Sequence, residues 1–464
     1  MRKPEAALGH FEKNFDSYVE RLKTITRIPS VSAEGFPREE VARCAEAVAA
    51  ELRAAGLENV RTIVYEGSHP YAYGEWLHAP GAPTILLYGH HDVQPPGRPE
   101  VWESPAFEPT VRADGRLYAR GIADDKAGVM MHVAAADSFL RAEKRLPLNV
   151  KVIIEGEEEV GSGHLEDFLR ANREMLAADY LVLTDTANFE EGIPAITFQL
   201  RGMVAVDVEV AGLRGRVHSG SWGGPVPDPI MALCRILDRL VDEDGVPCDP
   251  DIRAGIRETP DAARARLQAL PFDEADFMRQ AGLLPGVRIA GEKKYSVYER
   301  MWTRPSLTVV AMEASLMKDA TNQIVDSARA RVTVRIVPDQ DPEAVRDALV
   351  AALHRDPPWG VQVRAKPLHT GLWWTTEPSG PAFDAAMRAL RAGYEQEPAL
   401  IGCGGSIPFV KPFQDIFGGI PCLLLGVEDP TCQAHGENES LSLRDWRKAI
   451  RSAIYLYAEL AELR

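Results

Sequence analysis

Short apolar segments alternate with helical patterns in the first part of the chain and return near its end. Four of these segments, each bounded by Gly, Pro or Asp, have the composition of strands buried on both faces of a mostly parallel sheet. They are residues 84–88 (TILLY), 150–154 (VKVII), 180–183 (YLVL) and 421–425 (PCLLL). Each is closely followed by His, Asp or Glu. Because open α/β sheets bind ligands at the carboxyl ends of their strands, the pattern predicts one shared site.

Strict alternation of apolar and polar residues replaces this pattern between about 203 and 367 and predicts half-buried antiparallel strands. Strands near 204–210, 306–312, 328–337 and 361–366 and helices near 228–241 and 342–354 follow in the order of a ferredoxin-like split βαβ layer. The charged, Pro- and Gly-containing stretch 246–300 is long for a connection and indicates a partly helical insertion. We therefore expect residues 203–367 to form an α+β domain inserted into an α/β domain made of residues 1–202 and 368–464.

Composition excludes several classes of protein. The 464 residues are 45% apolar and 26% charged, which is typical of a soluble globular chain. Lys and Arg number 52 and Asp and Glu 68, so the net charge of −16 disfavours nucleic acid and anionic membranes as partners. The charged, amphipathic start of the chain has no apolar signal-peptide core, and no apolar run is long enough to span a membrane, so we expect a cytoplasmic protein.

The six cysteines form no CxxC pair, which argues against a disulfide framework or a thiolate zinc site. The strongest local motif is GHHDVQP, residues 89–95, directly after a predicted buried strand. His90 and Asp92 are two residues apart and point to the same side if strand geometry persists. His90 can then bind a metal while Asp92 accepts the other ring N–H. The alternative is a turn in which both side chains cap loop backbone.

Further carboxylates and a second histidine follow the other predicted strands. Asp124 and Asp125 lie in RGIADDKAG ahead of a helical pattern, where one of them can equally be an N-cap. The segment EGEEEVGS, residues 155–162, crowds carboxylates at the end of a buried strand, where they repel one another unless cations or protons neutralise them. Asp185 follows YLVLT, and His435 lies in QAHGENE. Two His and several carboxylates suit a pair of zinc, manganese or cobalt ions in a hydrolytic site.

These motifs resemble one known family across nearly the whole chain. The elements GHxDVxP, RGxxDDK, EGxEExGS, an SDT-like strand end and AHxxNE occur in the order and spacing of the di-zinc exopeptidases and deacylases. That family includes carnosine-type dipeptidases, aminoacylase and succinyl-diaminopimelate desuccinylase. The resemblance implies a zinc-exopeptidase-like α/β domain with an inserted ferredoxin-like domain that serves as lid and dimerisation domain.

The resemblance also implies roles for individual residues. His90 and Asp185 would hold one metal ion, Glu159 and His435 the other, and Asp124 would bridge the two. Asp92 would orient His90, and Glu158 would be the general base. We therefore expect two divalent ions per subunit, Zn²⁺ in the first place, with Mn²⁺ or Co²⁺ as alternatives.

Residues of the inserted domain resemble family elements around the substrate. His218, in VHSG, matches a histidine that reaches the partner subunit's active site and stabilises the oxyanion, which implies a homodimer with His218 acting in trans. Asn322 and Arg335 occupy positions used near the oxyanion and the substrate carboxylate. The segment GGSIP, residues 404–408, would bind a substrate terminus through Gly405 and Ser406. Cys403 stands where the family often has an acidic residue.

Three functions are compatible with these motifs. We expect a metal-dependent hydrolase that cleaves the amide bond of dipeptides or similar small amino-acid derivatives. The long insertion and the run ERMWTRP, residues 299–305, resemble the dipeptidase branch. An N-acyl- or carbamoyl-amino-acid amidohydrolase with the same centre is the alternative. A catalytically silent metal-binding scaffold is a third hypothesis, against which the presence of Glu158 argues.

Overall fold

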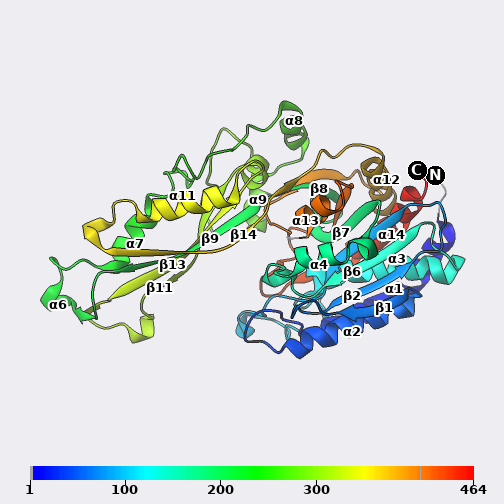
Figure 1. Ribbon diagram of the computed structural model, residues 1–464, viewed down its shortest axis with the longest axis horizontal. Coiled ribbons are helices and arrows are strands. Elements are labelled where there is room, and N and C mark those ends of the chain that lie inside the picture. Colours follow the sequence, from blue (N-terminus) through cyan, green and yellow to red (C-terminus); the bar gives the residue numbers. More distant parts are fainter. Residues whose placement is uncertain (1–3, 408, 464) are drawn as a thin grey trace. The chain divides into compact units, whose positions relative to one another are not determined.

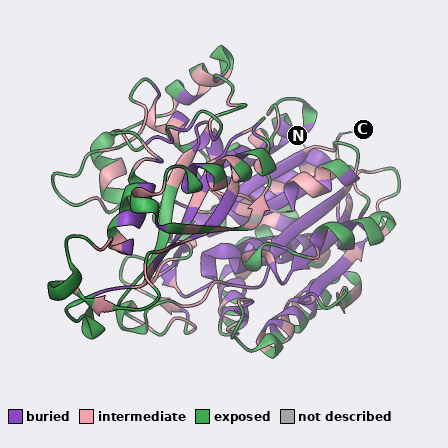
Figure 2. Ribbon diagram, turned by 60° about the vertical axis from the view of Figure 1, so that its left-hand side comes forward, coloured by how far each residue is buried: buried purple, intermediate pink, exposed green. Residues whose placement is uncertain are grey.

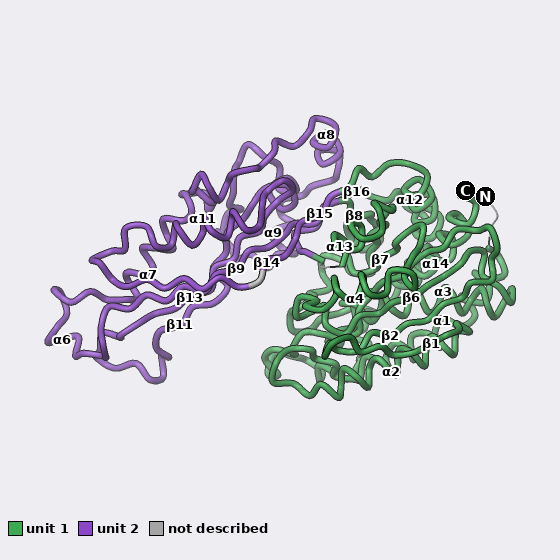
Figure 3. The backbone as a smooth tube through the Cα atoms, viewed as in Figure 1, with its two compact units in different colours: residues 1–198, 376–401, 407–464 green, residues 199–375, 402–406 purple. Residues whose placement is uncertain are grey.

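The computed structural model describes residues 4–407 and 409–463, so Pro408 of the GGSIP segment lies outside the described residues. The chain forms two compact units (Figure 3). Unit 1 comprises residues 1–198, 376–401 and 407–464, and unit 2 comprises residues 199–375 and 402–406. The inserted domain that we expect at 203–367 lies within the longer segment of unit 2.

A large mixed sheet forms the centre of unit 1 (Figure 1). Its four central strands run parallel in the order β6, β3, β7, β17, whereas antiparallel strands flank them on both sides. This arrangement confirms the predicted α/β class with a mostly parallel sheet. The strands in sheet order are β1 (Glu58–Ile63), β2 (Tyr71–Trp76), β6 (Asn149–Glu155), β3 (Thr84–His90), β7 (Tyr180–Ala187), β17 (Cys422–Glu428), β8 (Ala195–Leu200) and β15 (Trp374–Thr375), with β16 (Ala399–Cys403) paired to β8.

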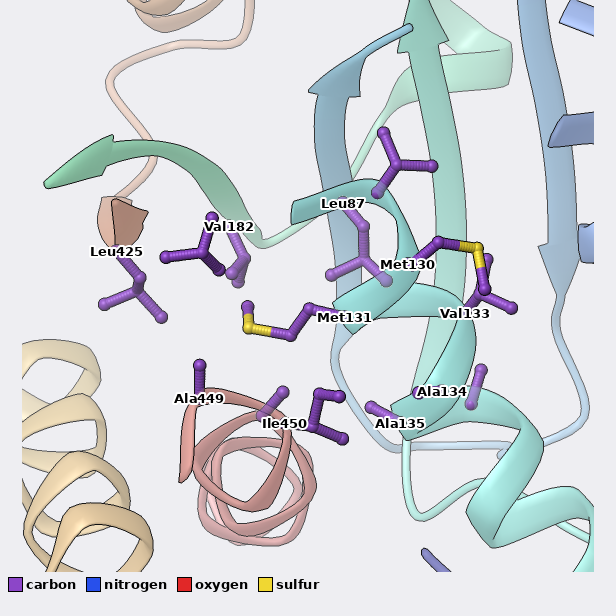
Figure 4. Packing of buried hydrophobic residues seen from close by; sticks show 14 of the residues in the cluster. Leu87, Met130, Met131, Val133, Ala134, Ala135, Val182, Leu425, Ala449 and Ile450 are labelled. Carbon is purple, nitrogen blue, oxygen red and sulfur yellow. The ribbon is translucent and has the colours of Figure 1, made fainter. Parts of the chain in front are cut away.

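Helices pack on this sheet through a continuous apolar core. Helix α3 (Ala127–Glu143) is apolar almost all round, and such a helix is stable only when it is buried. Figure 4 shows Met130 and Met131 of α3 packed among Leu87, Val182 and residues of α14. The helices of unit 1 are α1 (Glu5–Thr26), α2 (Arg38–Ala55), α3, α4 (Leu165–Ala171), α5 (Arg173–Leu176), α12 (Pro381–Tyr394), α13 (Val410–Ile416) and α14 (Leu443–Leu460).

A small second sheet of unit 1 lies close to the polar strand ends. Its three short strands pair in the order β18 (Ser440–Ser442), β5 (Arg116–Tyr118), β4 (Thr110–Val111). Ala119, just after β5, donates its backbone N–H to the carbonyl of Glu439 at 3.1 Å. The pairing therefore fixes the segment around residue 120 against the segment around residue 437.

Unit 2 contains a four-stranded antiparallel sheet with strand order β11-β13-β9-β14. Apolar side chains alternate along β9 and β13 and pack against helices on one face. Figure 2 colours the ribbon by burial, with the buried segments in purple. The chain order βαββαβ with this strand order confirms the ferredoxin-like prediction. The elements are β9 (Gly202–Ala211), α7 (Pro229–Asp238), β11 (Ser306–Glu313), β13 (Ser327–Ile336), α11 (Pro342–His354) and β14 (Gln362–Gly371).

The insertion in unit 2 is partly helical, as predicted. It contains the three helices α8 (Asp261–Ala269), α9 (Glu274–Gln280) and α10 (Val297–Trp302). A separate two-stranded element is made of β10 (Val217–His218) and β12 (Gln323–Ile324), with the short helix α6 (Ser219–Trp222) after β10. Across residues 4–407 and 409–463, none of the helices combines the length and the apolar content that a membrane crossing requires.

Candidate active site

The polar residues that follow the predicted strands meet at one edge of the sheet in unit 1. His90 ends β3 and pairs with Glu155, the last residue of β6. Tyr88 of β3 pairs with Leu183 of β7, so the register places His90 beside Asp185. His90 is fully buried, and its Nε2 lies 3.6 Å from Asp185 Oδ1. The parallel register therefore brings two residues 95 positions apart to the same edge.

The Asp124 carboxylate lies between two histidines. One oxygen, Oδ1, is 2.9 Å from His90 Nε2, and the other, Oδ2, is 2.9 Å from His435 Nε2. Glu159 Oε2 lies 3.3 Å from the same His435 nitrogen. One carboxylate that directs each of its oxygens to a different imidazole has the geometry of a bridging ligand between two neighbouring ions.

Asp92 contacts both His90 and the turn that carries Glu158 and Glu159. His90 Nδ1 lies 3.0 Å from the main-chain carbonyl oxygen of Asp92 and 3.5 Å from its carboxylate. The Asp92 carboxylate also accepts the backbone N–H groups of Glu158 at 3.2 Å and Glu159 at 3.1 Å, and the hydroxyl of Ser32 at 2.6 Å. The prediction assigned only the His90 contact to Asp92, whereas the structure shows that it also holds the turn that carries both glutamates.

Three overlapping groups of potential ligand atoms are present among the described residues. In each group, one atom of every member lies within 4.8 Å of one atom of every other member. The groups are His90, Glu158 and Asp185; Asp124, Glu159 and His435; and Asp124, Asp185 and Glu428. The nitrogen and oxygen donors without thiolate fit two divalent cations such as zinc, manganese or cobalt.

Burial and mutual repulsion raise the pKa values of two carboxylates at the site. Burial and the neighbouring Asp185 raise the pKa of Glu158 well above its ordinary value. Burial and Asp124 raise the pKa of Glu159 to about 7. Hydrogen bonds with Asp124 and Glu159 raise the pKa of His435 to about 11. Divalent cations would offset the negative charge that these buried carboxylates bring together.

Gly89 and Gly128 leave space for the carboxylate of Asp125, to which the sequence analysis assigned no specific role. Asp125 is buried, and its Oδ2 accepts the backbone N–H of His90 at 3.2 Å. A Cβ atom at Gly89 would lie 2.5 Å from Asp125 Oδ2, and one at Gly128 would lie 1.9 Å from Oδ1. The glycines of GHHD and DKAG therefore allow Asp125 to hold the backbone of His90.

Two further acidic residues at the site were missed. Glu428 ends β17, and its carboxylate belongs to the third group of ligand atoms. Glu439 is fully buried and accepts the backbone N–H groups of Gly121, Ala123 and Asp124 at 2.9, 2.9 and 3.2 Å. The signal for Glu428 was its place three residues after the predicted buried strand 421–425, a signal similar to the one that identified Asp185. Glu439 is the last residue of the AHxxNE element, but no role was predicted for it from the sequence.

His218 and Asn322, which are predicted to act near the oxyanion, lie together in unit 2. His218 pairs with Gln323 between β10 and β12, and the backbone N–H of Ser219 donates to the carbonyl of Asn322 at 2.8 Å. The exposed His218 accepts the backbone N–H groups of Gly220 and Ser221 at 3.1 and 3.2 Å through Nδ1, which leaves Nε2 outward.

Arg335 lies on β13 of the four-stranded sheet, where it pairs with Met203 and Ser306. Burial lowers the pKa of Arg335, and burial together with the charge of Arg335 lowers the pKa of Arg201 to about 10. Arg201 Nε donates to the carbonyl of Gly404 at 3.2 Å, and its Nη1 donates to Ser306 Oγ at 3.2 Å. Gly405 and Ser406, which directly follow Gly404, belong to unit 2 as well.

Comparisons with known proteins identify relatives along the whole chain. The sequence profile of peptidase family M20/M25/M40 matches residues 86–462. A cysteinylglycine-S-conjugate dipeptidase of Corynebacterium striatum is 35% identical over 78% of this chain and 77% of its own length. The Cys-Gly metallodipeptidase dug1 of Schizosaccharomyces pombe is 28% identical over 97% of each chain.

Two solved structures of dipeptidases have the same fold as this chain. Human carnosine dipeptidase 1 is 26% identical and covers 99% of both chains with a TM-score of 0.87. The dipeptidase Dug1p of Saccharomyces cerevisiae is 24% identical, and its TM-score of 0.89 over 99% of both chains shows a common fold.

Proposed function

Because the chain belongs to peptidase family M20/M25/M40 and is thus a metal-dependent hydrolase, we propose that it is a two-metal dipeptidase. The relatives named as Cys-Gly and cysteinylglycine-S-conjugate dipeptidases support a dipeptide as substrate. The observation that carries the two-metal proposal is the Asp124 carboxylate, which presents its two oxygens to His90 and His435, each at 2.9 Å.

His90, Asp124 and Asp185 would hold one ion, and Asp124, Glu159 and His435 the other. The chemistry that two divalent ions supply when bound is polarisation of the scissile carbonyl and acidification of water. Zn²⁺ remains our first expectation from the resemblance to the di-zinc family, with Mn²⁺ or Co²⁺ as alternatives.

Glu158 is the proposed general base. Its carboxylate lies in the group with His90 and Asp185, and burial and Asp185 raise its pKa, so it has a high affinity for a proton. It would take a proton from water as the water oxygen bonds to the scissile carbonyl carbon, and then give that proton to the leaving nitrogen as the C–N bond breaks. Asp92 holds the backbone of Glu158 and so directs the carboxylate.

Arg335 and the GGS segment would recognise the substrate carboxylate. Among the described residues, Arg335 and Arg201 have no carboxylate partner, although both are partly buried. Two guanidinium groups without a counterion favour binding of an anion, because an anion relieves their repulsion. Ser406 Oγ would donate a further hydrogen bond to the same carboxylate, and so would the Gly405 N–H, which otherwise donates to Cys403 Sγ at 3.3 Å.

We further propose that the enzyme is a homodimer with His218 acting in trans. Ser327 and Arg335 are eight residues apart on β13, which separates them by roughly 26 Å, and the separate β10–β12 element with His218 and Asn322 lies beyond the Ser327 end. Residues separated by that length of strand cannot all contact one dipeptide, whereas a second copy can supply the distant pair. Exposed Val309, Val310 and Met312 on the edge strand β11 offer an apolar surface for that copy.

A cleavage panel tests the proposed substrate class. The Zn²⁺- or Mn²⁺-loaded protein is offered dipeptides, N-acyl amino acids and carbamoyl amino acids side by side, with product release measured by mass spectrometry. We expect rapid release from dipeptides. Turnover of only N-acyl or carbamoyl substrates would show a deacylase, and no turnover with two ions bound would show a silent metal-binding protein.

A further inference from the structure

We propose that Glu428 is an additional ligand of the metal ion on the His90 side and that it biases this position toward an oxygen-preferring ion. The inference rests on the two-metal function proposed above. Glu428 is the last residue of β17, and it pairs with Ala187 near the end of β7. The parallel register thus places it at the same strand edge as Asp185.

The position of its carboxylate is that of a ligand. One Glu428 oxygen lies within 4.8 Å of an oxygen of Asp124 and of an oxygen of Asp185. Oxygens of ligands that share one ion are separated by distances in this range. Asp124 and Asp185 are also the two carboxylates that contact His90 Nε2, at 2.9 and 3.6 Å. An ion that Asp124, Asp185 and Glu428 hold together would therefore lie beside His90.

Arginines pair with two other buried acids of the same segment, whereas no arginine among the described residues pairs with Glu428. Asp429 accepts from Arg116 Nη2 at 2.8 Å, and Glu439 accepts from Arg120 Nη1 at 2.7 Å. Among the described residues, the Glu428 side chain has neither a hydrogen bond nor an ion pair with a cation. A carboxylate that faces two others without a counterion destabilises the metal-free fold, and an ion removes that cost.

The composition of the ligand set indicates which ion is favoured. With Glu428, the His90 side offers one imidazole nitrogen and three carboxylates, whereas the His435 side offers one imidazole and two carboxylates. Carboxylate-rich sets suit Mn²⁺, and zinc is well served by fewer ligands in tetrahedral geometry. Glu428 should therefore raise the affinity for Mn²⁺ relative to Zn²⁺ at one of the two positions.

The test is metal binding by the full-length Glu428→Gln protein, in which size is kept and charge is lost. Mn²⁺ is titrated into the metal-free protein, and free Mn²⁺ is measured by electron paramagnetic resonance. We expect one of the two Mn²⁺ dissociation constants to rise at least about 10-fold and the other to stay within about twofold. In a 1:1 mixture of Mn²⁺ and Zn²⁺, the bound Mn²⁺ fraction should fall, as measured by elemental mass spectrometry after gel filtration.

Matched variants separate ligation from folding and from a general charge effect. Glu190→Gln removes one charge beyond the end of β7, and its side chain belongs to none of the three ligand groups, so its Mn²⁺ binding should equal wild type. Glu428→Asp keeps the charge but withdraws the oxygens, and an intermediate loss of affinity is expected. The metal-free Glu428→Gln protein should unfold at the same temperature as wild type or a higher one, whereas its stabilisation by Mn²⁺ should be smaller.

Two results would overturn the assignment. Wild-type affinity for both Mn²⁺ ions in Glu428→Gln, with a raised KM, would show that Glu428 contacts the substrate instead. Equal Mn²⁺ losses in Glu428→Gln and Glu190→Gln would show a general charge effect. Binding of fewer than two ions by the wild-type protein would instead overturn the two-metal function, so the two failures are distinguishable.

Discussion

The carboxylates Asp124 and Glu158 differ in the direction of their pKa shifts because their partners differ. Asp124 lies between two histidines, and although burial opposes ionisation, their hydrogen bonds hold its pKa well below the usual range. Glu158 lacks such a hydrogen bond among the described residues, and burial and Asp185 raise its pKa. Two carboxylates of one site are thus suited to two tasks, one to remain ionised and one to accept a proton.

Replacement of Glu158 by Gln should separate these tasks. We expect both metal ions to remain bound and kcat to fall by at least about 10²-fold, because the proton of the attacking water has no acceptor. Dipeptide cleavage and metal content by elemental analysis are measured on the same sample. Loss of an ion together with activity would instead identify Glu158 as a ligand, a role that its grouping with His90 and Asp185 also permits.

His132 in α3 predicts a pH dependence of stability away from the ligands. Burial lowers its pKa to about 4, and it is held by the carbonyl of Tyr88 and the hydroxyl of Thr184. The same histidine in the unfolded chain binds a proton near pH 6.5. The unfolding free energy therefore has its full value above that pH and decreases as the pH falls toward 4. His132→Met should reduce the loss of unfolding free energy between pH 7 and pH 5 by about 2 kcal/mol.

The measurement is chemical denaturation of the metal-free protein at both pH values, so that release of metal does not contribute. The difference between wild type and variant isolates the one histidine from the other titrating groups. An unchanged difference would show that His132 gains a proton in the folded state without cost.

At the scale of elements, a buried ion pair connects the two loops that present Asp124 and His435. Arg120 Nη1 donates to Glu439 at 2.7 Å, and its Nη2 donates to the carbonyl of His435 at 3.1 Å. Glu439 in turn accepts the backbone N–H groups of Gly121, Ala123 and Asp124, which lie in one loop. The pair therefore fixes the distance between two metal-binding loops that are about 300 residues apart in the chain.

Glu439→Gln should weaken both folding and metal binding. Loss of the charge leaves Arg120 buried without a counterion, which we expect to lower the unfolding free energy by about 3 kcal/mol. Displacement of the Asp124 loop should weaken metal affinity by about 10- to 100-fold. Denaturation of the metal-free protein and a metal titration measure the two effects separately. Restoration of stability but not of metal affinity in Arg120→Met/Glu439→Gln would show that the loop contacts matter beyond the charge balance.

At the scale of the whole molecule, the separation of His218 from Arg335 along the length of β13 predicts complementation between copies. His218→Ala and Glu158→Ala should each be inactive as pure proteins. After mixing, unfolding and refolding together, a heterodimer would contain one site with an intact base and the partner's intact His218. Random pairing should restore about a quarter of wild-type activity. Refolded single variants are the controls, and a mixture as inactive as they are would contradict action in trans.

Much of the architecture was determined by local sequence. The runs TILLY, VKVII and YLVL predicted the parallel strands, and alternation in residues 204–210 and 328–337 predicted the antiparallel sheet, because burial on two faces or on one leaves a direct periodic signature. The motifs also identified the family, which the match over residues 86–462 confirms. The residue roles stay predictions, although the structure brings His90, Asp124, Glu159, Asp185 and His435 together.

Only the tertiary structure decided how these residues are related. The choice of His90 as the neighbour of Asp185 depends on the register of β3 with β7, and the choice of His435 as a neighbour of Asp124 depends on the Arg120–Glu439 pair; both join distant segments. Neither Glu428 nor Glu439 shows its partners in the sequence, yet Glu439 pairs with an arginine and Glu428 faces two carboxylates. Sequence patterns report whether a position is buried, because burial repeats with the local period. They do not report which charges meet, because that depends on contacts between segments that the local period does not encode.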